Sequence, residues 1–361
     1  MEFSVFISHM RIHPPEYYGR SLFEEKLIEA KAVDRLGYDC IWIPEHHLIH
    51  FMQAPSGLML CLHYGQQVSC PIGQMVNLLT YRHPLIAAGE LALADVLLDG
   101  RLLLGVGRGA YEYEFQRLEI PFATATEQFL EALDILELAW RSEDEGFEFH
   151  GKYYDIDTSY VWPRPIQKPH PEIWYAAMSP ASIEFCAKRG YHAVNWPFLR
   201  PMSFVRDVAE RFHEAREKAG NERGVQKLAI MRGVMVAETE SKARRSIEPM
   251  LINHRLNQRL HHFDFASASR GYIEPVPLDT EPSEQDVFDN MIIGTPAQCL
   301  EKLHEYEELG VDQFLLWFDY GPDHEAVLDA MEMFAAEVMA PFRRARGIAW
   351  PDHAVARTAA Q

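Results

Sequence analysis

The chain has 361 residues and a formal net charge of −19, from 34 basic and 53 acidic residues. Such an acidic surface repels phosphate backbones and anionic lipids, which argues against nucleic-acid or membrane-surface partners. The composition, 48% hydrophobic and 24% charged, is that of an ordinary globular protein, and no apolar run approaches the roughly 20 residues that span a bilayer. We therefore expect a cytoplasmic protein with one large domain, residues 1–350, and a flexible tail, residues 351–361.

Short apolar segments alternate with helical patterns along the whole chain. One helical pattern, for example, places apolar residues at helical spacing from Leu22 to Leu36 and stops at Gly37. The eight apolar segments that read as strands are 2–7, 40–43, 69–79, 101–106, 172–177, 192–196, 227–236 and 311–318. Strands that alternate with helices predict a parallel sheet. Eight repeats favour an α/β fold of the (β/α)8 TIM-barrel type in a single domain, with an open doubly wound sheet as the alternative.

Three segments interrupt this alternation. Residues 147–156, with His150-Gly151-Lys152 at their centre, predict a small hairpin outside the barrel. Residues 257–291 have no clean period and mix aromatic, serine, proline and acidic residues. Residues 49–67 form a connection longer than is usual between a strand and a helix, which favours a functional loop.

The strongest candidate site follows the second predicted strand. Pro44 ends that strand, and Glu45, His46 and His47 come directly after it, with His50 close by. In a closed barrel the active site lies at the carboxyl ends of the strands, so these titratable groups mark a candidate active site. In one alternative the histidines are structural and form hydrogen bonds to neighbouring loops. In the other they are metal ligands. The histidine spacing matches no standard zinc pattern.

The fourth strand ends in Gly105-Val106-Gly107-Arg108-Gly109. The glycines let the backbone approach a ligand closely, and the guanidinium of Arg108 suits a phosphate group. The alternative is a structural salt bridge from Arg108 to Glu112 or Glu114. The spacing is not that of a dinucleotide-binding fingerprint.

Two serines, Ser179 and Ser182, lie in the first turn of the helix after the fifth strand. The free N–H groups and the dipole of a helix start favour an anion, although an ordinary serine cap explains the pattern equally well. The other strand ends carry further polar and aromatic candidates: Asn77, Asn195, Trp196, Trp317 and Asp319. Together these residues predict a site with an anion clamp, aromatic walls and an imidazole, which fits flavin mononucleotide (FMN) or a phosphorylated sugar.

Several of these motifs occur in the order and at the separations of a known family. They are Glu45-His46-His47, His83-Pro84, Gly107-Arg108-Gly109, the turn at 177–182, Gly294-Thr295-Pro296 and Gly310-Val311-Asp312. In these motifs the chain resembles the bacterial luciferase-like flavin monooxygenases from about Phe3 to Arg346. The resemblance implies a (β/α)8 barrel that binds reduced FMN.

 The family's reduced FMN comes from a separate NAD(P)H:flavin reductase, and one oxygen atom of O2 enters a hydrophobic organic substrate by way of a flavin hydroperoxide.

The resemblance also implies roles for matching positions. His46, next to His47, matches the catalytic histidine, and Arg108 matches an arginine that contacts the phosphate. The positions that match other cofactor contacts are Met75 and Val76 (often a non-proline cis peptide that supports the flavin ring), Asn77, Met178, Ser179, Ser182 and Trp196. The segment 257–291, with Phe263, Phe265 and Tyr272, matches a mobile loop that closes over the site. A homodimer is implied as well.

The chain departs from the family pattern in three places, one of which is the rebuilt loop after His47, so we do not expect light emission. Residues 123–127 lack a second arginine found in the luciferase subunit, and an acidic position is Met178 here. Three alternatives remain open: an oxidoreductase of the same superfamily that uses a deazaflavin coenzyme, a non-catalytic flavin-binding subunit, and a metal-dependent barrel hydrolase. The sequence does not identify the substrate.

Overall fold

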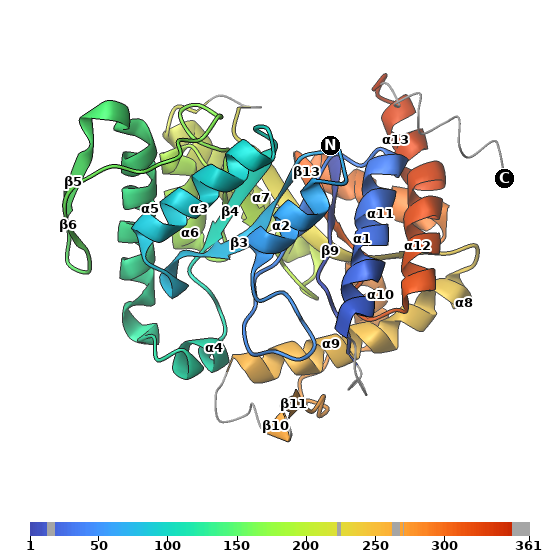
Figure 1. Ribbon diagram of the computed structural model, residues 1–361. Helices are drawn as coiled ribbons and strands as arrows, with labels where there is room; N and C mark the ends of the chain where they lie inside the picture. Colours follow the sequence, from blue (N-terminus) through green and yellow to red (C-terminus); the bar gives the residue numbers. More distant parts are fainter. Residues whose placement is uncertain (13–18, 222–224, 262–267, 270, 349–361) are drawn as a thin grey trace.

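The computed structural model describes residues 1–12, 19–221, 225–261, 268–269 and 271–348. Its centre is a parallel barrel, in which each strand pairs with two neighbours and the sheet closes through the pairing of β13 with β1 and of β8 with β9 (Figure 1). The barrel strands are β1 (Glu2–Phe6), β2 (Ile41–Ile43), β3 (Ile72–Leu78), β4 (Leu102–Gly107), β7 (Ile173–Ala176), β8 (His192–Asn195), β9 (Leu228–Val236) and β13 (Gln313–Trp317). The predicted TIM barrel is confirmed, and the open doubly wound sheet is wrong.

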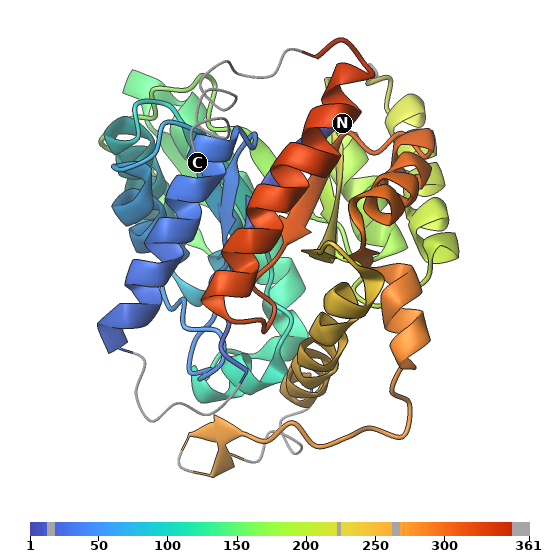
Figure 2. The ribbon, with the colours of Figure 1, turned by 90° about the vertical axis from the view of Figure 1, so that its right-hand side faces the viewer.

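Helices surround the barrel and bury one face each against it (Figures 1 and 2). In α1, for example, Leu22, Ala30 and Val33 are buried, which is the face expected from their spacing. The outer helices are α1 (Gly19–Leu36), α2 (Gly57–Gly65), α3 (Pro84–Leu97), α5 (Ala125–Arg141), α6 (Pro180–Arg189), α7 (Met202–Lys218), α11 (Pro296–Glu308) and α12 (His324–Met333). A π-helical stretch, Phe334–Met339, joins α12 to α13 (Ala340–Arg344).

The interior of the barrel is filled by side chains. Trp42 of β2 and Trp174 of β7 are both almost completely buried, and their rings meet edge to face with centroids 5.5 Å apart. The two strands are not neighbours in the sheet, so the rings meet inside the barrel. This packed core leaves the ends of the strands as the place for a site.

The insertions differ in part from the prediction. The hairpin is confirmed as β5 (Phe147–His150) and β6 (Asp155–Ser159), which project from the side of the barrel (Figure 1). The connection at 49–67 is not all loop, because Ser56 caps α2 within it. A short strand that was not predicted, β12 (Ile292–Gly294), pairs with the end of β9.

The segment 257–291 is more regular than predicted. Its first residues belong to α9 (Ile247–Leu260), which follows the short helix α8 (Glu240–Ala243), and its last part contains α10 (Glu284–Asn290). Between them lie the paired strands β10 (Ala268–Ser269) and β11 (Tyr272–Ile273). Phe263 and Phe265 lie outside the described residues, as does the predicted tail.

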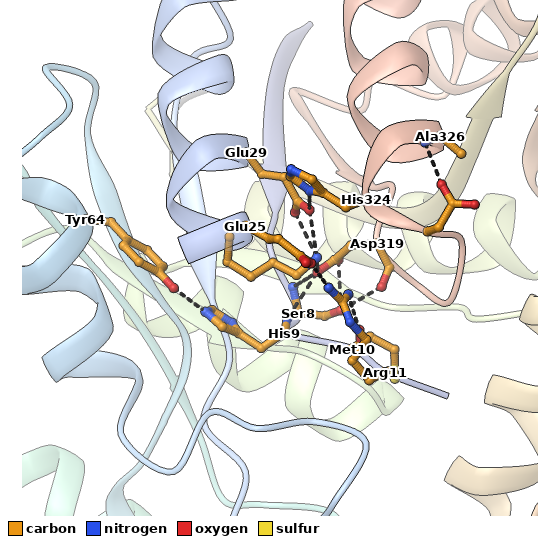
Figure 3. Close-up of polar contacts among 12 residues, drawn as sticks. Ser8, His9, Met10, Arg11, Glu25, Glu29, Tyr64, Asp319, His324 and Ala326 are labelled. Atoms are coloured by element: carbon orange, nitrogen blue, oxygen red, sulfur yellow. Dashed lines mark hydrogen bonds and ion pairs between the residues drawn. The ribbon is translucent and has the colours of Figure 1, made fainter. Parts of the chain in front are cut away.

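A buried charge cluster lies beside the strand ends at the seam between β1 and β13 (Figure 3). The Nζ of Lys26 is 2.9 Å from a carboxylate oxygen of Glu29 and 3.0 Å from one of Asp319. The backbone N–H groups of Ser8 and His9 also donate to Asp319, at 3.0 and 3.1 Å. Burial works against ionisation, but the Lys26 ammonium and the Ser8 donors hold the pKa of Asp319 below its ordinary value. Asp319, a candidate site residue from the sequence, is therefore part of the structural seam.

Candidate active site

The carboxyl ends of the strands lie on the side of the barrel where α9 and the β10–β11 hairpin are found, the lower side in Figure 1. Glu45, directly after β2, is buried there. Its carboxylate is 2.5 Å from Nη2 of Arg82 and 3.0 Å from Nε2 of His47, and the side-chain amide of Gln74 donates to it at 3.3 Å. The backbone N–H of Leu78 also donates to it at 3.4 Å, so Glu45 fixes the base of the loop that carries the histidines.

The ring of His46 lies against residues that follow β4. Its backbone N–H donates to the carbonyl of Ala54 at 2.9 Å, and its ring lies 5.1 Å from that of Tyr111. Its Nδ1 is 3.4 Å from a carboxylate oxygen of Glu114, and about a fifth of the His46 side chain is exposed. The arrangement orients one ring nitrogen toward a buried carboxylate, as a histidine that moves protons requires.

Glu114 was missed as a site residue by the sequence analysis, which considered it only as a salt-bridge partner of Arg108. It lies in α4 (Glu112–Arg117), a short helix that was not predicted, and it is completely buried. Its carboxylate accepts hydrogen bonds from the backbone N–H of His47 at 2.6 Å and from the hydroxyl of Tyr81 at 3.3 Å. The bond from the His47 N–H holds the loop, and the carboxylate lies 3.4 Å from Nδ1 of His46, which has no hydrogen-bond partner among the described residues.

Tyr111 and Asn257 were also missed. The Tyr111 hydroxyl donates to the side-chain oxygen of Asn257 in α9, and the Asn257 amide donates to the carbonyl of Asn253 at 2.9 Å. The bond from Tyr111 joins α9 to the segment before α4, and the Tyr111 ring lies against that of His46. The run of aromatic residues at 111–115 was the available signal, and only the fold reveals that α9 meets it.

Arg108 makes no ion pair with a carboxylate within the described residues, so the alternative of a structural salt bridge to Glu112 or Glu114 is wrong. Its Nη1 donates to the hydroxyl of Thr126 at 3.3 Å and its Nε to the carbonyl of Gly109 at 3.0 Å. Its guanidinium carbon lies 4.7 Å from the centre of the Phe122 ring. Burial lowers the pKa of this guanidinium, which marks a cation that lacks a counter-charge.

The glycines beside Arg108 serve the neighbouring strand. A Cβ on Gly105 would lie 2.1 Å from the carbonyl oxygen of Gln74, and one on Gly107 would lie 2.7 Å from the side chain of Val76. The lack of a side chain at Gly105 and Gly107 therefore makes room for β3. From the sequence we expected it to make room for a ligand. The Met75–Val76 peptide bond is cis, as the resemblance implied. Its contact with a flavin ring stays a prediction.

Two buried asparagines carry side-chain oxygens without a hydrogen-bond donor among the described residues. Asn77 donates from its amide to Gln74 at 2.9 Å, and Asn195 donates to the carbonyl of Ala177 at 2.6 Å. The Oδ1 atom of each is buried and has no partner. Buried acceptors of this kind usually meet a donor, so each suits a ligand with N–H groups.

Trp196 and Met178 lie together after neighbouring strands. The Trp196 N–H of the backbone donates to the sulfur of Met178 at 3.4 Å. The Trp196 ring meets Phe198 edge to face at 4.8 Å and Trp317 at 5.6 Å. Met178 is about half exposed, so this cluster of side chains reaches the protein surface at Met178.

Ser179 and Ser182 form a capping box at the start of α6. The Ser182 backbone N–H donates to the Ser179 hydroxyl at 3.3 Å, and the Ser179 backbone N–H donates to the Ser182 hydroxyl at 2.8 Å. The alternative of an ordinary helix cap is thus confirmed. A phosphate contact at this helix start stays a prediction.

The predicted catalytic and cofactor-binding residues lie in or directly after five consecutive strands of the sheet, in the spatial order β2, β3, β4, β7 and β8. This part of the barrel end combines a cation without an anion, two amide oxygens without donors and an oriented imidazole. These groups fit a ligand with an anionic end and a ring that carries N–H donors, as in FMN. The residues that the structure describes contain no group of three histidines, cysteines or carboxylates placed to hold a metal ion.

A surface hollow of about 1540 Å³ lies elsewhere. It is bordered by α12, the connection from β9 to α8, and residues such as Arg11 and His324. None of the site residues predicted from the sequence lines it. In the described part of the chain, no helix is both long and apolar enough to cross a membrane.

Comparisons with known proteins agree with the geometry. Residues 1–313 match the family described as luciferase-like monooxygenases. The chain is 26% identical over 363 residues to the oxygenase component of a flavin-dependent trigonelline monooxygenase from Acinetobacter baylyi, covering 96% of this chain and 97% of the relative. It is 25% identical over 245 residues to an FMNH2-dependent dimethylsulfone monooxygenase from Pseudomonas putida, covering 65% of this chain and 66% of the relative.

A solved structure shares the fold at low sequence identity. An F420-dependent secondary alcohol dehydrogenase superposes with a TM-score of 0.75 at 16% identity, covering 94% of this chain and 98% of that chain. At this identity the likeness concerns the fold alone.

Proposed function

Because the chain belongs to the luciferase-like monooxygenase family, we propose that it is the oxygenase of a two-component monooxygenase that takes reduced FMN from a separate NAD(P)H:flavin reductase. The observation that carries the proposal is the half-buried Arg108, a cation with no carboxylate partner in the described residues. Two relatives support it, since one is named an oxygenase component and the other is named FMNH2-dependent. When bound, reduced FMN supplies the electrons that activate O2, so that one oxygen atom enters a hydrophobic organic substrate.

Each group at the barrel end has a part in this proposal. Arg108 binds the phosphate, aided by the N-terminal turn of α6 at Ser179 and Ser182. Asn77 and Asn195 accept hydrogen bonds from N–H groups of the ring with their free side-chain oxygens. Trp196, Met178 and the Met75–Val76 step would hold the ring. The hydroxyl of Thr126, which contacts Arg108, takes the place of the second arginine.

His46 holds and moves a proton at its Nε2 atom. With Nδ1 turned toward Glu114, the second nitrogen is the one that serves as acid or base, assisted by His47 on the same loop. A His46→Ala variant should bind reduced FMN as the native protein does and lose most of its oxygen transfer. Oxygen transfer that is unchanged in this variant would remove the role.

The experiment that tests the proposal is an anaerobic titration with photoreduced FMN, followed by mixing with oxygenated buffer in a stopped-flow instrument. The proposal predicts saturable binding of reduced FMN and a delayed return of the absorbance of oxidised flavin. If reduced FMN does not bind and the reduced deazaflavin coenzyme does, the deazaflavin alternative replaces it. That alternative is favoured by the shared fold with the F420-dependent dehydrogenase alone.

We also propose a homodimer. The outer face of α3 exposes Ile86, Leu93 and Leu97, between 45% and 58% of each residue, and α2 exposes 71% of Met59. Apolar surface of this kind usually marks a protein contact. A Leu93→Asp, Leu97→Asp double variant should run as a monomer in light scattering, and a native protein that is itself monomeric would contradict the dimer.

A further inference from the structure

The β5–β6 hairpin runs beside α5 (Figure 1), and two carboxylates of α5 hold its turn. The carboxylate of Glu131 accepts hydrogen bonds from the backbone N–H groups of residues 152–154, at 2.8, 2.9 and 3.2 Å. The Nζ of Lys152 and the hydroxyl of Tyr153 both donate to Oε2 of Glu127 at 2.7 Å. An insertion outside the barrel thus places a cation at a fixed point beside α5.

That point is the start of α5, where the candidate phosphate site lies. Glu127 is in the first turn of α5 and directly follows Thr126, whose hydroxyl accepts a hydrogen bond from Nη1 of Arg108 at 3.3 Å. In α6, whose start flanks the same site, the first turn contains no acidic residue. A helix start and a guanidinium favour an anion, so the charge of Glu127 opposes a phosphate there.

The contact between Lys152 and Glu127 brings together two full charges. The hydrogen bonds from Lys152 and Tyr153 lower the pKa of Glu127, so this carboxylate is ionised at neutral pH. The bond to Glu127 raises the pKa of Lys152, so the ammonium keeps its proton. Both side chains are well exposed, and such pairs contribute little to stability. The pair therefore matters more for the charge beside Arg108 than for the stability of the fold.

We propose that Lys152 neutralises Glu127 at the start of α5, so that the site of Arg108 binds the phosphate group of the flavin and prefers a flavin that carries this group. The inference rests on the proposed function and adds a positioning residue to the same site. Lys152 acts through the charge of Glu127 and does not touch the ligand. The β5–β6 hairpin, which is outside the barrel repeat, thereby takes part in cofactor selection.

Three variants change the local charge in known steps. Lys152→Met leaves one negative charge at the pair, Glu127→Gln leaves one positive charge, and the double variant is neutral like the native pair. The proposal predicts that affinity for reduced FMN is highest in Glu127→Gln, equal in the native protein and the double variant, and lowest in Lys152→Met. If the pair only tethers the hairpin, all three variants lose the same tether and should behave alike.

The measurement is anaerobic titration with reduced FMN and with reduced riboflavin, which lacks the phosphate. At low ionic strength Lys152→Met should weaken reduced FMN about threefold and leave reduced riboflavin unchanged, and about 0.5 M salt should remove most of the difference. The circular dichroism spectrum and the thermal midpoint should stay as in the native protein.

The matched control is Lys168→Met, which removes another exposed cation, paired with Glu143 at 2.9 Å. Lys168 follows Gln167, whose amide donates to the carbonyl of Leu102 at the amino end of β4, so it lies at the opposite end of the barrel. This variant should bind both flavins as the native protein does.

Three results would overturn the inference and leave the proposed function standing, because the native protein still binds reduced FMN in each. They are unchanged affinity for reduced FMN in Lys152→Met, equal weakening of both flavins, and a double variant as weak as Lys152→Met. A native protein that binds no reduced flavin would overturn both.

Discussion

Two charged regions lie at the same end of the barrel, and they differ in whether the chain completes them. In the seam between β1 and β13, the ammonium of Lys26 meets Glu29 and Asp319 at 2.9 and 3.0 Å. At the end of β4, the guanidinium of Arg108 meets a hydroxyl, a carbonyl and an aromatic ring. In the first region the chain itself supplies the counter-charge, and in the second it does not. A cation without an anion is stabilised when an anionic ligand binds, so the second region suits such a ligand.

The largest expected effect comes from breaking the complete region. A Lys26→Met variant leaves the buried carboxylate of Asp319 without its cation and that of Glu29 with only the ring of His324, 2.9 Å away, so the free energy of unfolding should fall by about 3–5 kcal/mol in urea titrations. The matched control is Arg20→Met, which removes an exposed cation paired with Glu24 and should change stability by less than about 0.5 kcal/mol. Equal stability of the two variants would show that the seam does not hold the barrel closed.

The second effect is a pH dependence in the complete region. Burial lowers the pKa of His9 from 6.5 to about 3. Between these values the unfolded chain binds a proton that the folded chain does not, so stability should fall as pH falls below 6.5. The loss is about 1.4 kcal/mol per pH unit, measured by urea unfolding at pH 7, 6 and 5. His9→Gln should flatten this slope, and His63→Gln, an exposed control, should leave it. A slope that survives in His9→Gln would assign it to other groups.

The third and smallest effect tests the orientation of His46. Glu114→Gln keeps the shape and an acceptor for the His47 N–H while removing the charge beside Nδ1 of His46. After anaerobic loading with reduced FMN, mixing with oxygen should return the absorbance of oxidised flavin about tenfold faster than in the native protein. Glu112→Gln, on the same helix, should behave as the native protein. If oxidised flavin returns at the same rate in both variants, Glu114 only holds the loop that carries His47.

The fold followed from the sequence because the apolar strands and amphipathic helices repeat with a clear period. The helical pattern from Leu22 to Leu36, for instance, was predicted to stop at Gly37, and α1 ends at Leu36. The errors fall where no period was available. The helix α4 is six residues long, and α2 lies within a stretch that was predicted as a loop.

The sequence predicted several residues of the candidate site, but it did not predict which residues they contact. His46 and Arg108 follow the second and fourth strands of the barrel, whose ends the repeat locates. The partner of His46, Glu114, and the bond from Tyr111 to Asn257 depend on where α4 and α9 cross the barrel end. Such crossings are set by tertiary packing, which the local sequence does not encode.

The most direct test of the comparison is a binding cycle between Arg108 and the phosphate group. Reduced FMN and reduced riboflavin are titrated anaerobically into the native protein and into Arg108→Met, with Arg211→Met as the exposed control. The account predicts that Arg108→Met weakens binding of reduced FMN by about tenfold or more, leaves reduced riboflavin unchanged, and leaves the free energy of unfolding within about 0.5 kcal/mol of the native value. If the variant weakens both flavins equally, or loses stability as Lys26→Met does, then Arg108 belongs to the fold and the central claim is contradicted.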